Sequence, residues 1–77
     1  MWNNRIIKHE KNGTIWHGVH EVFYNKDGSI YAYTEDAITI IGETEEETIE
    51  QVEQILRDIK DTPVLAASEI EFKEYEE

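Results

Sequence analysis

The chain contains no cysteine, a single proline and four glycines among its 77 residues. The lack of cysteine excludes disulfides, thiolate zinc sites and a cysteine nucleophile. No apolar run approaches the roughly 18 residues that a membrane-spanning helix needs, and Met1–Asn4 does not begin a signal peptide. We therefore expect one soluble, cytoplasmic domain over residues 1–77, with residues 74–77 frayed, because so short a chain cannot bury a second core.

Basic residues are scarce and unevenly placed. The chain has seven Lys and Arg residues and eighteen Asp and Glu residues, which gives a formal net charge of −11. Residues 1–40 hold four basic and five acidic side chains, whereas residues 41–77 hold three and thirteen. The acidic half would repel a phosphate backbone, so we expect no direct nucleic-acid partner. The same field would attract a basic protein or a cation, and it also keeps a small protein soluble.

A hairpin is the first structure that the sequence predicts. Asn12-Gly13 is typical of a two-residue type I′ turn, and it joins the β-compatible run 5–10 to a long run, 14–24, that is rich in Ile, Trp, Val, Phe and Tyr. A two-residue turn places His9 opposite Trp16. The two runs therefore form an antiparallel pair.

A second turn signal extends the hairpin into a meander. Residues 25–28, Asn-Lys-Asp-Gly, suit a turn that is closed by a glycine bulge. A third strand is expected over residues 29–41. The poor strand sequence Glu-Asp-Ala at 35–37 predicts a bend or bulge within it.

The segment after Gly42 carries the strongest helix signal. Thr44 and Glu47 form a capping box, the first turn is acidic, and Pro63 prevents continuation beyond about Lys60. Apolar residues recur every three or four positions, at Ile49, Val52, Ile55, Leu56 and Ile59. This spacing predicts an amphipathic helix.

A fourth strand is expected within residues 64–73, where an apolar run precedes an alternating one. A right-handed crossover through the helix would place it parallel to the first strand, in the spatial order 3-2-1-4. The predicted fold class is therefore α+β: an antiparallel three-stranded meander, one helix on one sheet face and a fourth strand, in the order β-β-β-α-β.

The strand over residues 14–24 is apolar on both sides. Even-numbered positions hold Trp16, Gly18, His20, Val22 and Tyr24; odd-numbered ones hold Ile15, His17, Val19, Glu21 and Phe23. In the expected register Ile7, Ile30 and Ala32 join the even face, whereas Ile6, Tyr31 and Tyr33 join the odd face. One helix covers only one face, and we expect the even one, where Gly18 and Ala32 allow close approach. The other face would then be an exposed apolar surface of the kind that marks an interface, unless the terminal segments fold over it.

This reasoning predicts a non-enzymatic binding module that acts as a homodimer or on a protein partner through the uncovered sheet face. The candidate contact residues are His20, Tyr24 and Tyr33, with Glu21 and Glu35 as polar anchors. No catalytic residue, cofactor or metal is assigned. His17 and His20 point to opposite faces of a regular strand, and His9 is two rungs from His20, so a shared zinc ion is not expected.

Two alternatives remain open. Glu45, Glu46, Glu47, Glu50 and Glu53 form an acidic ridge that would suit an inhibitor that mimics nucleic-acid phosphate in the basic groove of a partner. The simplest view of this ridge is a solvated, well-capped helix face. A small hydrolase that uses His20 with a nearby carboxylate is the second alternative.

Two resemblances add to this picture. The stretch 16–24, with Gly28, the pair Thr34-Glu35, Gly42-Glu43 before the helix and Pro-Val-Leu after it, resembles a family of small uncharacterised bacterial proteins, over about residues 5–65. That resemblance implies no catalytic residues. The longer tail at 68–77 departs from its pattern.

The element order and the helix entry Gly42-x-Thr44-x-Glu46-Glu47 also resemble the HicB-like antitoxin domain. In that family the domain binds a small basic RNA-cleaving toxin, and a further segment often binds DNA. This chain has no such DNA-binding segment and lacks neighbouring Pro-Gly features. The likeness therefore bears on the fold more than on the activity.

Overall fold

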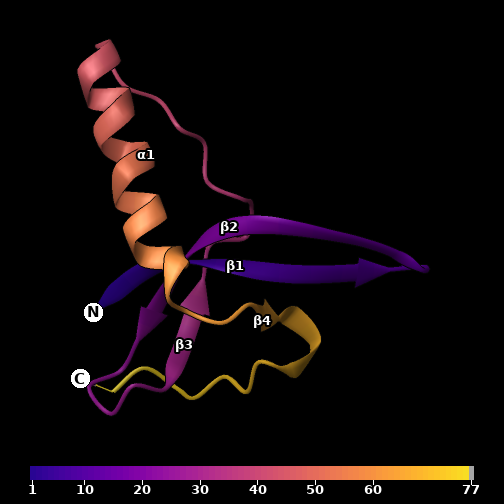
Figure 1. Cartoon of the computed structure of the whole chain (residues 1–77). Helices are drawn as coiled ribbons and strands as arrows, with labels where there is room; N and C mark the ends of the chain where they lie inside the picture. The colour runs from indigo at the N-terminus through magenta and orange to yellow at the C-terminus, as the bar shows by residue number, and fades with distance from the viewer. Residues whose placement is uncertain (77) are drawn as a thin grey trace.

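The computed structural model describes residues 1–76, and in this range it has the predicted α+β architecture. The elements follow the order β1 (Trp2–Lys11), β2 (Thr14–Tyr24), β3 (Ile30–Tyr33), α1 (Glu45–Lys60), β4 (Leu65–Ala66) and the 3₁₀ turn η1 (Ala67–Glu69). They form a mixed, curled sheet in the order β3-β2-β1-β4, with β4 parallel to β1 (Figure 1). The predicted strand order is therefore confirmed.

The β1–β2 hairpin has the expected register, with His9 opposite Trp16 and Lys11 opposite Thr14. Asn12 and Gly13 both have positive φ, 52° and 81°, as a type I′ turn requires. Paired residues share a sheet face. We call the face with the even-numbered residues of β2 the histidine face, and the face with its odd-numbered residues the helix face.

Strand β3 is shorter than expected and its register differs. Beyond Tyr33 the chain bends at 35–36, and regular pairing with β2 ends. Two later backbone amides still donate to β2, Thr34 N to Glu21 O (3.0 Å) and Ile38 N to Val19 O (2.8 Å). A bulge at Phe23/Tyr24 pairs Tyr33 with Val22. The expectation that Tyr33 lies on the odd face and Ala32 on the even face is wrong, because one extra residue reverses every side chain beyond it.

Helix α1 begins as predicted at the N-cap Thr44, whose Oγ1 accepts from Glu47 N at 3.1 Å, while the Glu47 carboxylate accepts from Glu43 N at 2.9 Å. It lies against the helix face, because both the amide and the side chain of Asn4 donate to Asp58. The expectation that the helix covers the even face is therefore wrong. On that face imidazole rings occupy the space above Gly18.

The C-terminal segment covers the histidine face instead. The Phe72 ring stacks on Tyr33 with centroids 5.7 Å apart, and Lys73 N donates to Ile30 O at 2.9 Å. Glu74 O and Glu76 N both bond to the side chain of the buried Asn25. The expectation of a sheet face left uncovered is therefore wrong at this end of the sheet. Glu77 lies outside the described residues.

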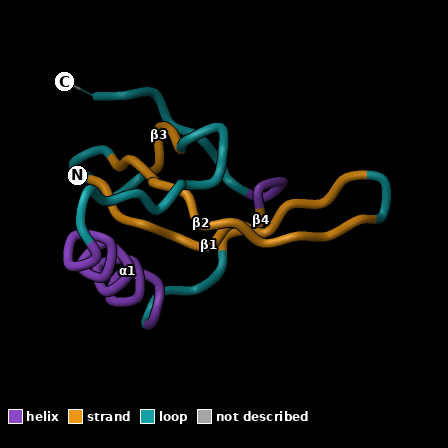
Figure 2. Tube along the Cα trace, turned by 90° about the horizontal axis from the view of Figure 1, so that it is seen from above, coloured by secondary structure: helices purple, strands orange, loops and turns teal. Residues whose placement is uncertain are grey.

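The molecule is nevertheless open in shape. The hairpin and α1 project from the sheet in different directions (Figures 1 and 2). The radius of gyration is 13.6 Å, against about 11.5 Å for a compact domain of this length. Its accessible surface is 5983 Å², whereas a compact 9.1 kDa monomer exposes about 4,900 Å². Among residues 1–76 only two apolar side chains, Ile7 and Val22, are fully buried.

Candidate functional site

A pair of histidines lies on the histidine face. The Nε2 atoms of His9 and His20 are 2.9 Å apart, and His20 Nδ1 is 2.8 Å from the carbonyl oxygen of Thr34. Only 2% of His20 is exposed. Trp16 stacks on His9 with ring centroids 5.3 Å apart, and Tyr33 meets His20 edge-on at 5.4 Å. His20 is thus a packed part of the core, whereas His9 is half-buried.

The surrounding groups fix where the protons lie. A carbonyl oxygen only accepts, so Nδ1 of His20 donates to Thr34. The Nε2 of neutral His20 must then accept from Nε2–H of His9. The pKa of His9 is lowered, because burial disfavours its charged form and His20 adds a like-charge repulsion. With both ring nitrogens of His20 engaged, a substrate would have to displace His9 in order to reach it.

Gly18 makes this pairing possible. A Cβ at position 18 would lie 3.1 Å from His20 Nε2 and 3.3 Å from the Cβ of Ala37. The missing side chain lets two rings from diagonal positions meet above it. The two histidines are two rungs apart in the sheet, and for that reason the sequence did not predict their contact. A signal for it was available, because Gly18 lies between Trp16 and His20 on the same face and leaves room for the rings.

The other candidate contact residues are divided between environments. Tyr24 donates from its hydroxyl to Asn3 Oδ1 at 2.7 Å and accepts from Arg5 at 3.0 Å, on the histidine face. Tyr33 is half-buried between His20 and Phe72.

The two acidic candidates lie elsewhere. Glu21 is on the helix face opposite Asn4, and Glu35 is exposed in the bend after β3. The fold therefore brings His20 and Tyr33 together but does not bring them to one surface with Glu21.

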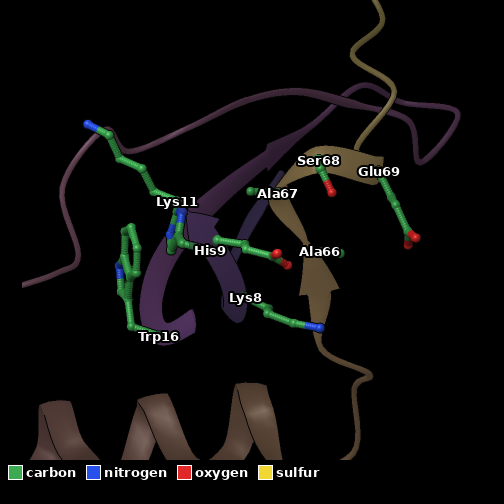
Figure 3. Close-up of a pocket in the computed structure, with 9 residues that line it drawn as sticks. Lys8, His9, Lys11, Trp16, Ala66, Ala67, Ser68 and Glu69 are labelled. Atoms are coloured by element: carbon green, nitrogen blue, oxygen red, sulfur yellow. The ribbon is translucent and has the colours of Figure 1, made fainter. Parts of the chain in front are cut away.

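An open groove of about 550 Å³ lies between the hairpin and the β4–η1 segment (Figure 3). His9 and Trp16 form the hairpin side, and Ser68 and Glu69 of η1 lie on the other side. Lys8 and Lys11 also line it. Two of the seven Lys and Arg residues of this acidic chain therefore line the same groove as the half-exposed ring of Trp16.

A strip of exposed apolar side chains lies on α1. None of the helix residues, all of them within the described range, is buried. Half-buried side chains such as Gln51, Ile55 and Asp58 mark the side that faces the sheet. Beside them lies a stripe that we call the open flank, which consists of Ile49 (47% exposed), Val52 (46%) and Leu56 (57%). Residues at this spacing share one side of a helix, so the three form a continuous apolar strip.

The tip of the hairpin is the second exposed apolar element. We call residues 8–17 the hairpin arm. Ile15 and Trp16 in it are each about half exposed, at 51% and 46%. The arm has two lysines and one glutamate, whereas α1 has six acidic and two basic residues. The two projecting parts of the molecule therefore carry opposite charge.

Residues 1–76 contain neither a candidate metal site nor a candidate membrane-spanning helix. No group of three or more His, Cys, Asp or Glu side chains in this range is arranged to hold a metal ion. Within the same range, no helix is both long and apolar enough to span a membrane.

Comparison with known proteins identifies no relative. No family model, curated protein or solved structure matches this chain. The site must therefore be interpreted from its own chemistry.

Proposed function

We propose that this protein is a small, non-enzymatic binding module that works as a homodimer and associates through the open flank of α1. The observation that carries the proposal is an amphipathic helix with no buried residue, whose apolar strip lies about half exposed beside the side that faces the sheet. A stable monomer rarely leaves such a surface exposed, because each apolar side chain in water forgoes the free energy of burial.

The histidine pair supports a binding role rather than catalysis. Its two rings and the Thr34 carbonyl satisfy one another. Both ring nitrogens of the buried His20 are engaged in these contacts, so neither is free to exchange a proton with a substrate. Away from the hairpin arm, α1 lies against one face of the sheet and the C-terminal segment against the other, so the exposed side of α1 offers a contact surface.

An acidic inhibitor of a basic protein is the second candidate. It is favoured by the exposed carboxylates of α1, of which Glu45, Glu46 and Glu53 border the open flank at helical spacing. Within residues 1–76 the salt bridges of the structure involve Lys73, not these groups. Such a complex would weaken steeply with salt, since exposed charges are screened over about 8–10 Å at ordinary ionic strength.

Sedimentation velocity over a concentration series tests the proposal. We expect the wild-type chain to sediment as a dimer and the variant Val52→Glu/Leu56→Glu to sediment as a monomer with an unchanged far-UV circular dichroism spectrum. Lys26→Glu is the control, because it adds negative charge in an exposed turn and should leave the dimer intact. A wild-type chain that stays monomeric at high concentration would overturn the proposal.

A further inference from the structure

The hairpin arm and the open flank of α1 complement each other in polarity and in charge, although they project apart within one chain (Figure 1). We propose that two copies associate reciprocally, with the arm of each copy lying along the open flank of the other. This inference rests on the proposed function, and it names the surface that covers the flank.

The apolar parts match in kind. The flank offers Ile49, Val52 and Leu56, all about half exposed. The arm offers one exposed apolar side chain on each of its two faces, Trp16 on the histidine face and Ile15 on the helix face, so the face that carries Trp16 is the one placed against the flank. Aromatic residues in such positions are frequent anchors of protein interfaces. Trp16 is also held in place by its stack on His9, so little conformational entropy is lost when it docks.

The charges of the two surfaces are opposite in sign. Lys8 and Lys11 lie on the arm, and Glu45, Glu46 and Glu53 lie beside the flank. An arm placed along α1 would bring ammonium groups near carboxylates on the partner. Parallel contacts between two arms or between two helices would instead place like charges together, which opposes association.

The available area also fits. The monomer exposes about 1,000 Å² more than a compact chain of its mass, and a standard interface takes about 800 Å² from each partner. Each copy has one arm and one flank. A twofold arrangement uses both and closes the assembly, whereas a head-to-tail contact would leave one arm and one flank free and continue into a polymer.

Charge-reversal variants test this arrangement by recombination. Lys8→Glu/Lys11→Glu makes the arm acidic, and Glu46→Lys/Glu53→Lys makes the border of the flank basic. Each variant alone pairs like charges at both contacts, so its dimer should weaken about tenfold or more at low salt. An equimolar mixture of the two should restore a heterodimer, because both contacts then join opposite charges. Circular dichroism checks that each variant is folded.

Two controls accompany the mixture. Lys26→Glu and Glu71→Lys/Glu74→Lys change charge of the same signs away from both surfaces and should leave the dissociation constant of the dimer unchanged. A wild-type dimer that the reversals leave within about twofold, or a mixture that fails to recombine, would overturn the arm contact. The proposed function would survive that result if Val52→Glu/Leu56→Glu still abolishes the dimer. It would fail with a monomeric wild type or with a Val52→Glu/Leu56→Glu variant that remains dimeric.

Discussion

The base of the molecule, which is the sheet outside the hairpin arm together with the C-terminal segment, differs from the two projecting parts, the hairpin arm and α1, in how far its apolar residues are buried. In the base, Ile7 and Val22 are completely buried, and the buried His20 is paired with His9 and packs against Tyr33. In the projecting parts, Leu56 of α1 and Trp16 of the hairpin arm are about half exposed. The comparison teaches that the chain completes one small core by itself and leaves much of its remaining apolar surface exposed.

The largest expected effect separates these regions directly. Ile7→Ala should lower the free energy of unfolding by about 2–5 kcal/mol, because it leaves a cavity in the base. Leu56→Ala should cost less than about 0.5 kcal/mol when measured below the concentration of dimer formation. Urea unfolding at low protein concentration compares the two. Equal losses would mean that α1 is packed as tightly as the base.

A smaller effect is expected at the contact between the histidines. Gly18→Ala would introduce a Cβ at 3.1 Å from His20 Nε2, and overpacking of this kind costs about 1–3 kcal/mol. The change should also separate the His9 and His20 rings, which nuclear magnetic resonance of the imidazole protons would detect. Unchanged stability and unchanged imidazole signals would show that the base has more room than the structure gives it.

Acid should weaken the base more than the projecting parts. The folded-state pKa of His9 lies below its ordinary value of 6.5, so the native state binds fewer protons than the unfolded state just below that pH. The free energy of unfolding should therefore fall as the pH drops through about 6.5 and into the range of the lowered pKa.

Urea midpoints between pH 7.5 and 5.5 measure this dependence. His9→Gln should flatten it, whereas His17→Gln, at an exposed position, should keep it. A wild-type urea midpoint that does not change over this pH range would contradict the proposed contribution of His9 to the pH dependence of stability.

The smallest effect concerns the tie between the C-terminal segment and the β2–β3 turn. Lys73 Nζ lies 2.6 Å from Asp27 Oδ2 and 2.8 Å from Glu76. The pair raises the pKa of Lys73 and lowers that of Asp27. Because these groups are exposed, solvent screens them, and Lys73→Ala should leave the urea midpoint unchanged within error at 0.15 M salt. A clear loss would mean that the segment depends on this ion pair rather than on Phe72.

Local signals explain why much of the fold was predictable. Asn12-Gly13 fixes a two-residue turn and with it the whole β1–β2 register, and Thr44 with Glu47 fixes where α1 begins. The length of β3 and the face of Tyr33 were not predictable, because the bulge at Phe23/Tyr24 depends on how the turn after Tyr24 closes against the C-terminal segment. Of the candidate site, the sequence identified His20 and Tyr33 but did not predict that His9 meets His20.

The sequence by itself determined the order of the elements, the hairpin, the helix cap and the acidic character of α1, because turns, caps and charge act over a few neighbouring residues. Only the tertiary structure decided that α1 lies on the odd face and that the chain's own C-terminus covers the other. Those choices depend on contacts between residues more than 40 positions apart, such as Asn4 with Asp58 and Asn25 with Glu74. Such contacts form only where several weak preferences are satisfied together, and no local pattern encodes them.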